Sequence, residues 1–306
     1  MKKLRWLAAG MVVGCGVGLA QPGVPAAPAA GAATQEIATP AIWRVKGAHG
    51  TVYLFGTVHM MKPEVVWETG KVKDALAASG VLYLEIANMD DMAAAQPVII
   101  QAGLDTAHPL SSKLSPGDVA LLDTEAKEIG LPGEQAFEAM RPWLVSATLS
   151  VLPMVKAGYG PATGIDMKLL AEAKAEQKQV LGFETMEQQM HMLADVPEAD
   201  QVKELHRDLA EMDKQTAETN ELVAAWEKGD VERIGKIDND ELAAKYPAEY
   251  KRVVVDRNAR WAATLDGLLK DPGTGTVFVA VGAAHLAGPD SVIRMLEKDG
   301  WTVERE

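Results

Sequence analysis

Residues 51–61 read TVYLFGTVHMM, an apolar strand pattern that ends in Gly-x-x-His. Residues 276–288 read TVFVAVGAAHLAG and repeat that order near the other end of the chain. Gly56 and Gly282 let the chain turn off each strand without a Cβ in the way, and they leave room for a ligand close to the backbone. The histidine that follows each glycine can then point back over the edge of a sheet.

Apolar runs that alternate with helix-forming segments predict an α/β fold. AIWRV and TVYLFGT, separated by KGAHG, predict a hairpin. Residues 65–80 are expected to form a helix that leads to a buried strand at 81–86, and this order favours parallel pairing. The regions 89–176 and 185–270 have mostly helical patterns, with strands at 178–184 and 276–281. We therefore expect a mixed central sheet with a large helical insertion.

Polar side chains stand where four of these strands end: His59, Glu85, Glu184 and His285. In open α/β sheets, ligands bind outside the carboxyl ends of the strands, so these side chains are expected to share one edge. Two imidazoles with one or two carboxylates suit Mn, Co, Fe or Zn. Without a metal, a histidine held by a carboxylate could act as a general base on water.

A purely structural interpretation also stays open for these residues. The carboxylates could cap helices or pair with arginines, and the histidines could be satisfied structural residues. Arg257 could pair with a site carboxylate, clamp an anionic group of a substrate, or form a surface ion pair.

The first residues have the layout of a secretory signal. Residues 1–20 carry three basic residues, a short apolar run and then small residues. Cleavage after Ala20 would fit soluble export, whereas VVGC fits lipoprotein processing with a lipid anchor at Cys15. Residues 21–40 predict a Pro/Ala-rich spacer, and 41–306 the folded domain. We expect an exported protein, periplasmic or secreted, or an outer-membrane lipoprotein.

The composition narrows the classes of partner and of chemistry. The net charge is −13, and loss of the signal leaves 27 basic against 43 acidic residues, or −16. An acidic surface argues against nucleic acid and anionic membranes as partners. We expect no transmembrane segment in the mature chain. Cys15 is the single cysteine, so metal ligands in the folded domain must be His, Asp or Glu.

Six blocks of sequence, in order, resemble the TraB/GumN family, whose eukaryotic relatives include the Tiki proteases. The blocks are WRVKGAHGTVYLFGTVH, YLEI, TGID, QVLGFETMEQQ, DRNARWAATL and VFVAVGAAHLAG. The resemblance implies an α/β fold shared with erythromycin-esterase-like and haem-iron-utilisation-like proteins. It also covers most of the chain that follows the spacer.

The resemblance further implies roles for individual residues. In the Tiki branch, the two Gly-x-x-His motifs and a glutamate belong to a metal-dependent protease that uses manganese or cobalt. These positions correspond to His59, His285 and Glu85 in this sequence. The other matching blocks supply further candidates: Asp166, Glu184, Gln188, Arg257 and Asn258.

The leading hypothesis is an exported, metal-dependent hydrolase acting on peptide bonds, with His59, Glu85 and His285 holding the metal and its water. Glu184 would be a further ligand or the general base, Arg257 would stabilise an oxyanion or a substrate carboxylate, and Asn258 would assist them. The remaining residues would bind substrate or support the site: Gly56, Gly282, Asp166 and Gln188. The alternatives are a non-catalytic binding or assembly protein for exported polysaccharide, and a periplasmic protein that binds haem or iron.

Overall fold

The computed structural model describes residues 37–68 and 70–306, so the predicted signal and most of the spacer lie outside the described residues. Its central feature is a six-stranded sheet in the order β4-β3-β5-β2-β1-β6. Strands β4, β3, β5 and β2 run parallel, and β1 is antiparallel to β2 and β6. The strands are β1 (Ile42–Lys46), β2 (Thr51–Thr57), β3 (Val81–Ile86), β4 (Gln179–Glu184), β5 (Thr276–Gly282) and β6 (Val303–Arg305).

The strand pairing confirms the predicted mixed sheet. It also shows a strand order that local patterns do not predict. Strands β1 and β2 form the expected hairpin, closed by a hydrogen bond from the Gly47 N–H to the Gly50 carbonyl at 2.9 Å. Strands β2 and β3 are parallel but do not pair with each other. Instead β5, from the end of the chain, lies between them.

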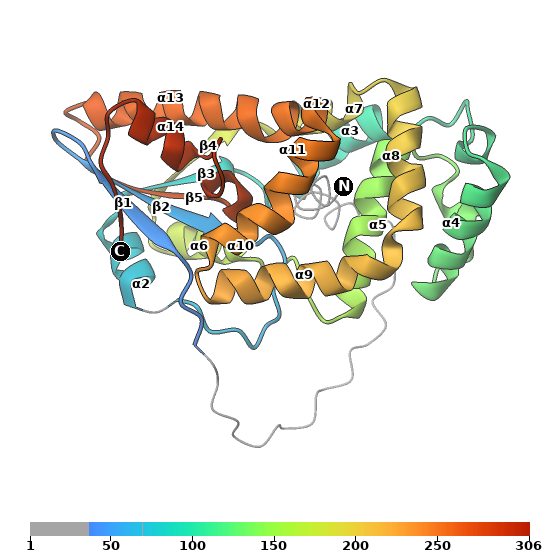
Figure 1. Cartoon of the computed structure of the whole chain (residues 1–306), viewed down its shortest axis with the longest axis horizontal. Coiled ribbons are helices and arrows are strands. Elements are labelled where there is room, and N and C mark those ends of the chain that lie inside the picture. The colour runs from blue at the N-terminus through green and yellow to red at the C-terminus, as the bar shows by residue number, and fades with distance from the viewer. Residues whose placement is uncertain (1–36, 69) are drawn as a thin grey trace, which may run out of the picture.

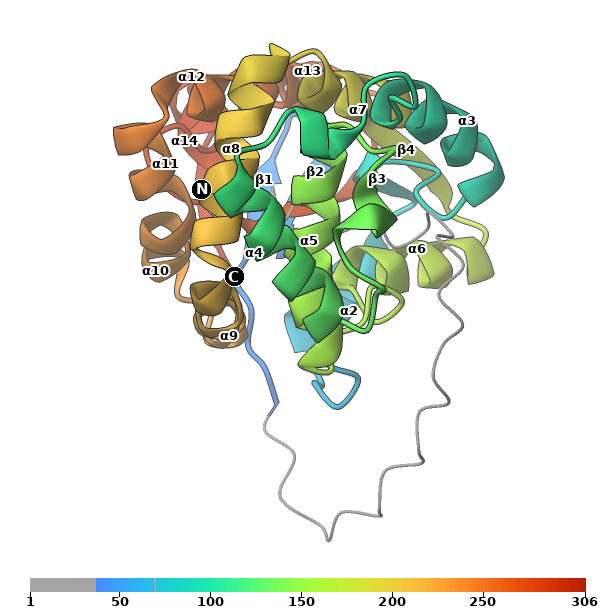
Figure 2. The ribbon, with the colours of Figure 1, turned by 90° about the vertical axis from the view of Figure 1, so that its right-hand side faces the viewer.

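Most of the remaining chain is helical, and Figures 1 and 2 show the helices around the sheet. The α-helices are α2 (Gly70–Ala78), α3 (Met92–Gly103), α4 (Pro116–Glu128), α5 (Pro142–Lys156), α6 (Ile165–Ala175), α7 (Met186–Ala194), α8 (Glu198–Ala210), α9 (Met212–Glu227), α10 (Val231–Gly235), α11 (Glu241–Lys245), α12 (Pro247–Tyr250), α13 (Asp256–Lys270) and α14 (Val292–Lys298). Short segments are the 3₁₀ helices η1 (Leu110–Ser112), η2 (Glu134–Phe137) and η5 (Ala283–Leu286), and the π-helices η3 (Lys236–Asp240) and η4 (Lys251–Val255). In the described part of the chain, no helix has the length and apolarity needed to cross a membrane.

Alternating side chains of each strand build two apolar layers, because successive residues point to opposite faces. Val52 and Leu54 of β2 pack with α13 and α14 on one face. Phe55, on the opposite face, packs with α2, α6 and α9. Figure 1 shows α13 and α14 on one side of the sheet and α2, α6 and α9 on the other. The sheet is therefore covered on both faces, and its strand ends lie among the connecting segments.

Several predicted helices differ in their limits. The segment 65–80 becomes helical only at Gly70, and Trp67 before it stacks on Phe55 with ring centres 5.9 Å apart. The charged stretch 201–226, within the region expected to be mostly helical, is divided between two helices, because α8 ends at Ala210 and α9 begins at Met212. One side of α8 is buried against α5. The apolar residues on that side therefore decide where the helix packs, although many residues around them in the sequence are charged.

Candidate active site

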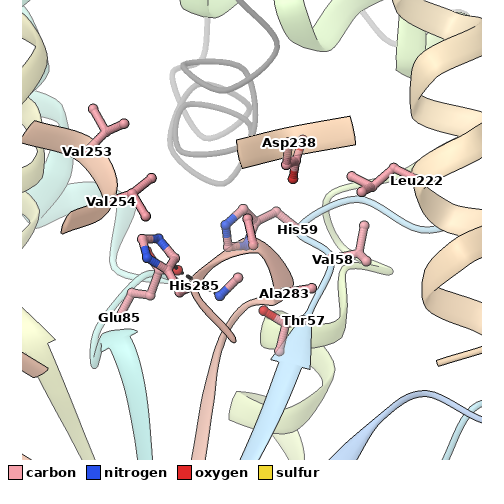
Figure 3. A pocket seen from close by; sticks show the side chains of 12 residues that line it. Thr57, Val58, His59, Glu85, Leu222, Asp238, Val253, Val254, Ala283 and His285 are labelled. Carbon is pink, nitrogen blue, oxygen red and sulfur yellow. Dashed lines mark hydrogen bonds and ion pairs between the residues drawn. The ribbon is translucent and has the colours of Figure 1, made fainter. Parts of the chain in front are cut away.

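The two Gly-x-x-His turns lie side by side at the carboxyl edge of the sheet. Parallel pairing places Thr57 of β2 opposite Gly282 of β5, so the two turns begin at the same level. Glu85, near the end of β3, faces this edge as well. Figure 3 shows His59, Glu85 and His285 around one cavity. Three of the four strand-end side chains therefore converge on one cavity, whereas Glu184 does not line it.

His59 is held by a buried carboxylate. Its Nδ1 lies 2.7 Å from Asp166 Oδ2, and Thr57 Oγ1 donates to Asp166 Oδ1 at 2.5 Å. Asp166 lies in the first turn of α6, which comes very close to the His59 backbone. A Cβ on Gly164 would overlap the His59 carbonyl oxygen, so only glycine permits this approach. With Nδ1 bound to Asp166, His59 presents Nε2 to the cavity.

The carboxylate changes the protonation of His59. Burial disfavours the charged ring and by itself lowers the pKa, but the negative charge of Asp166 and its hydrogen bond outweigh burial and raise the pKa of His59 to about 9. Glu85 adds a smaller contribution in the same direction. At neutral pH, His59 therefore carries protons on both nitrogens unless a ligand displaces the proton on Nε2.

His285 has the same position in its motif but a neutral partner. Its Nδ1 lies 2.6 Å from Asn258 Oδ1, and Asn258 Nδ2 donates to the Asp290 carbonyl at 2.7 Å. Arg257 Nη1 lies 3.0 Å from His285 Nε2. Because a guanidinium can only donate, Nε2 must accept and the ring proton must be on Nδ1. His285 is therefore a neutral imidazole in this arrangement.

Arg257 on α13 joins two strand-end carboxylates. Its Nη2 donates to Glu85 Oε2 at 2.6 Å and to Glu184 Oε2 at 2.8 Å, and its Nε lies 3.0 Å from both Glu184 oxygens. Gln189 Nε2 donates to the same Oε2 atoms of Glu85 and Glu184, at 3.2 and 3.0 Å. The guanidinium is fully buried and packs over the Trp261 ring, 4.6 Å from its centre. One cation and one amide thus hold both acids in place.

This network keeps Glu85 ionised. Burial alone raises the pKa of a carboxyl group, but the charge of Arg257 above all, and also that of the protonated His59, holds the pKa of Glu85 well below its usual range. The Gly282 N–H also donates to Glu85 Oε1 at 2.8 Å. The pKa of Arg257 is lowered by burial, yet the charges of Glu85 and Glu184 raise it overall.

The cavity between these groups is small and has apolar walls. The cavity volume open to water-sized molecules is ≈ 40 Å³. That is room for a few waters, each of which needs about 10–15 Å³. Most polar groups of the lining lie at the edge formed by the strand ends, and Asp238 of η3 is a further polar residue of the lining. The apolar part of the lining consists of Val58, Leu222, Val253, Val254, Ala283 and Ala284.

Comparison with known proteins agrees with this architecture. The model of the TraB/PrgY/gumN family matches residues 41–305, nearly all of the described chain. The chain belongs to the TraB/PrgY/gumN family. The family resemblance in the sequence and the mixed α/β fold that it implied are both confirmed.

Two relatives of this family member share its sequence at a low level. An uncharacterized protein of Treponema pallidum (strain Nichols) is 23% identical over 273 residues, which cover 84% of this chain and 80% of that protein. Metalloprotease TIKI1 of Danio rerio is 24% identical over 313 residues, which cover 86% of this chain and 62% of that protein. No solved structure matches the chain significantly.

His59, Glu85 and His285 of this family member offer nitrogen and oxygen atoms of the kinds that bind divalent metals. A Cβ on Gly282 would lie 3.7 Å from His59 Nε2, 3.2 Å from Glu85 Oε1 and 3.6 Å from His285 Cδ2, so the three groups surround one point. Two imidazoles and a carboxylate form a common metal-binding set. Each histidine also has an oxygen acceptor at Nδ1, as metal-bound histidines do.

The same donors would have to draw closer together to bind a metal. Within residues 37–68 and 70–306, no group of three or more His, Cys, Asp or Glu side chains could hold a metal ion as it stands. Glu85 Oε1 lies 3.9 Å from His285 Nε2. Arg257 Nη1 would have to break its contact with His285 Nε2. The same nitrogen also donates to the Val253 carbonyl at 3.4 Å. His285 and Arg257 would have to move apart before the set could open, so these residues fit a metal by the type of their donor atoms and not by their present geometry.

Some of the other predicted site residues contact the histidines or line the cavity, and others do neither. Asp166 and Asn258 contact the histidines directly, and Gly282 lines the cavity. Arg257 and Glu184 do not line the cavity, and the contacts described above occupy them. This favours a positioning role for both over the general-base and oxyanion roles expected for them.

Gly56 lies behind the cavity. Its carbonyl accepts a hydrogen bond from Trp226 Nε1 at 2.7 Å. A Cβ on Gly56 would lie only 2.9 Å from the Ala283 Cα. The glycine is therefore needed for the close approach of the two turns, and not for room at the ligand.

Gln188 lies outside the network, and its neighbour Gln189 is inside it. The Gln188 side chain accepts from the Thr185 N–H at 2.9 Å, and Thr185 Oγ1 accepts from the Gln188 N–H at 3.1 Å, which forms a capping box at the start of α7. The order Thr-x-x-Gln before a helix is a recognised signal for this cap. That signal in the sequence could have assigned Gln188 to the cap and directed attention to Gln189.

Proposed function

We propose that this chain is a metal-dependent hydrolase that acts on peptides at this cavity. One observation carries the proposal: two histidines that follow parallel neighbouring strands lie around one point with an ionised carboxylate, and His59 Nε2 and Glu85 Oε1 are both close to that point. Support for a metal and for peptides comes from the similarity to Metalloprotease TIKI1 of Danio rerio. The expected export of the chain fits a hydrolase that works outside the cytoplasm.

Each residue of the site has a defined task in this proposal. His59, Glu85 and His285 would hold the metal, which when bound polarises a carbonyl and lowers the pKa of water. Asp166 and Asn258 fix the ring orientations of the two histidines. Hydrolysis consumes one water, whose oxygen bonds to the carbonyl carbon while the C–N bond breaks and the nitrogen gains a proton.

The test is metal content by elemental mass spectrometry, with peptide hydrolysis measured on the same samples. Wild type is compared with His59→Ala and His285→Ala, and His191→Ala serves as control because His191 is exposed on α7. We expect near-stoichiometric Mn, Co, Fe or Zn in wild type and in the control, with loss of both metal and hydrolysis in the two site variants. Full hydrolysis by chelator-treated site variants would rule out the proposal.

A second candidate is a hydrolase that works without a metal. It is favoured by the protonated His59–Asp166 pair and by the Arg257 contact that already occupies His285 Nε2. His59 Nε2 would give its proton to the leaving nitrogen, and Glu85 Oε1 would accept a proton from water. Hydrolysis that survives chelation but is lost in Asp166→Asn would identify this mechanism.

The non-hydrolytic alternatives make different predictions. Glycan binding that persists in a His59→Ala, His285→Ala double variant would support a polysaccharide-binding or assembly protein. Haem binding through these histidines is disfavoured, because the cavity has room for only a few waters. The absence of a Soret band on titration with haemin would confirm that.

A further inference from the structure

Glu85 has one oxygen in a buried hydrogen-bond network and the other at the cavity. Its Oε2 accepts from Arg257 Nη2 at 2.6 Å and from Gln189 Nε2 at 3.2 Å. Its Oε1 accepts from the Gly282 N–H at 2.8 Å, and a Cβ on Gly282 would lie 3.2 Å from this oxygen. Each oxygen of a carboxylate has about two lone-pair sites. Both sites of Oε2 are therefore used, whereas Oε1 keeps one for a ligand at the cavity.

Glu85 cannot orient its own carboxylate, because the last torsion of a glutamate side chain is broad. The groups around the carboxylate must therefore decide which oxygen faces the cavity. At Oε2 these groups are Arg257, which is a cation, and Gln189, which is a neutral amide. The amide turns its nitrogen toward Glu85, because a carboxylate oxygen only accepts hydrogen bonds.

Gln189 also links Glu85 to the second strand-end acid. Its Nε2 lies 3.0 Å from Glu184 Oε2, and Arg257 Nη2 lies 2.8 Å from the same oxygen. Two nitrogens, each with two hydrogens, thus bridge one pair of oxygens from neighbouring strands. The two acids repel each other if only one nitrogen joins them, and the repulsion is strong where water is excluded. Gln189 therefore holds Glu85 beside Glu184 without adding a charge.

The start of α7 determines where Gln189 points. Glu184 ends β4 and Thr185 caps α7, so the helix begins at the carboxyl edge of the sheet. The Gln189 N–H donates to the Thr185 carbonyl at 3.2 Å, and Gln189 is only 3% exposed. The first turn of α7 thus places a buried amide directly behind the acid that lines the cavity.

We propose that Gln189 is a positioning residue for the reaction: by engaging Glu85 Oε2, it keeps Oε1 directed at the cavity. This rests on the proposed function. It applies with or without a metal, because Oε1 would bind the metal in one mechanism and accept a proton from water in the other. Residues that orient a metal-binding group through hydrogen bonds change metal affinity or activity by about 10–100-fold when they are replaced.

The test is Gln189→Met, which keeps the length of the side chain and removes its hydrogen bonds. Co²⁺ is titrated into chelator-treated protein, and its visible absorption reports both affinity and coordination geometry. We expect Gln189→Met to bind Co²⁺ about 10–100-fold more weakly and with a changed spectrum. In peptide hydrolysis, kcat should fall by a similar factor while KM changes by about twofold or less. A purely structural role would lower the melting temperature and leave these quantities unchanged.

Gln101→Met is the matched control, because it makes the same substitution at an exposed position of α3. Its Co²⁺ affinity, spectrum and kcat should stay within about twofold of wild type. If Gln189→Met does not fold, Gln189→Asn takes its place, because its amide is shorter by one methylene and falls short of Glu85. The same losses are expected for it.

The outcomes separate this proposal from the proposed function. Unchanged Co²⁺ affinity, spectrum and kcat in a folded Gln189 variant would overturn the positioning role and leave the hydrolase standing. Weaker Co²⁺ binding in the variant, without hydrolysis of any peptide by wild type, would support the orientation of Glu85 and remove the hydrolase. Wild type that neither binds Co²⁺ nor hydrolyses peptides would overturn both.

Discussion

The two Gly-x-x-His turns match in sequence and differ in what they contact. The turn after β2 sets His59 against a carboxylate, Asp166, and the ring is protonated at neutral pH. The turn after β5 sets His285 against an amide, Asn258, while Arg257 donates to its other nitrogen and keeps it neutral. The same local motif thus gives one protonated imidazole and one neutral imidazole.

The difference shows that partners from other helices decide the chemistry of each histidine. Asp166 comes from α6 under one face of the sheet, and Asn258 comes from α13 over the other face. The His285 half also contains the buried guanidinium that holds Glu85 and Glu184. Three experiments can break or sharpen this comparison, and the largest effect is expected for the guanidinium.

Arg257→Met should destabilise the protein by about 3–5 kcal/mol, because it leaves Glu85 and Glu184 buried without their cation. Arg260→Met is the matched control, since Arg260 also donates to Glu184, at 3.2 Å, but its side chain is 61% exposed. An exposed pair of this kind contributes at most about 1 kcal/mol. Urea unfolding measures both. Equal effects would mean that the His285 half does not depend on a buried charge.

Asp166→Asn should remove a pH dependence that belongs to the His59 half. The pKa of His59 rises from 6.5 to about 9 on folding, so its stabilising contribution is complete below pH 6.5 and is lost as the pH rises through 9. In chelator-treated wild type we expect a loss of about 2–3 kcal/mol across this window. The variant should show almost none of it.

Denaturant unfolding at several pH values measures that effect, and an NMR titration of His59 gives its pKa directly. Asn258→Asp is the reciprocal change, because it gives His285 a carboxylate partner and should introduce a similar pH dependence there. An unchanged pH slope in Asp166→Asn would show that Asp166 does not set the charge of His59.

The two glycines of the motifs should respond differently to alanine. Gly56→Ala should destabilise by about 1–3 kcal/mol, since the new Cβ would press on the Ala283 backbone. Gly282→Ala should change stability by less than about 1 kcal/mol, because its φ of −48° suits alanine and its nearest neighbours are side-chain atoms. It should instead weaken metal binding, because the Cβ fills the space between the donors. Thermal unfolding and metal titration of both variants test this, and equal melting temperatures would contradict it.

Much of this arrangement could be predicted from local patterns. Short apolar runs ending in His59, Glu85, Glu184 and His285 predicted both the sheet and the edge where these residues gather. The strand order could not be predicted, because β5 is inserted between β2 and β3 from the far end of the chain. Gln188 was predicted to bind substrate or support the site, but in the structure it caps α7, and its neighbour Gln189 contacts Glu85 and Glu184.

The sequence by itself determined the α/β class, the family and the polar residues at the strand ends. The class and the strand-end residues follow from periodicity and residue type over a few neighbouring positions, and the family follows from the resemblance of six ordered blocks of sequence. Tertiary structure decided which residues meet: His59 with Asp166, which is 107 positions away, and Arg257 with Glu85, which is 172 positions away. Charge state and site geometry depend on these distant contacts, because burial and neighbouring charges shift a pKa while sequence spacing says nothing about either.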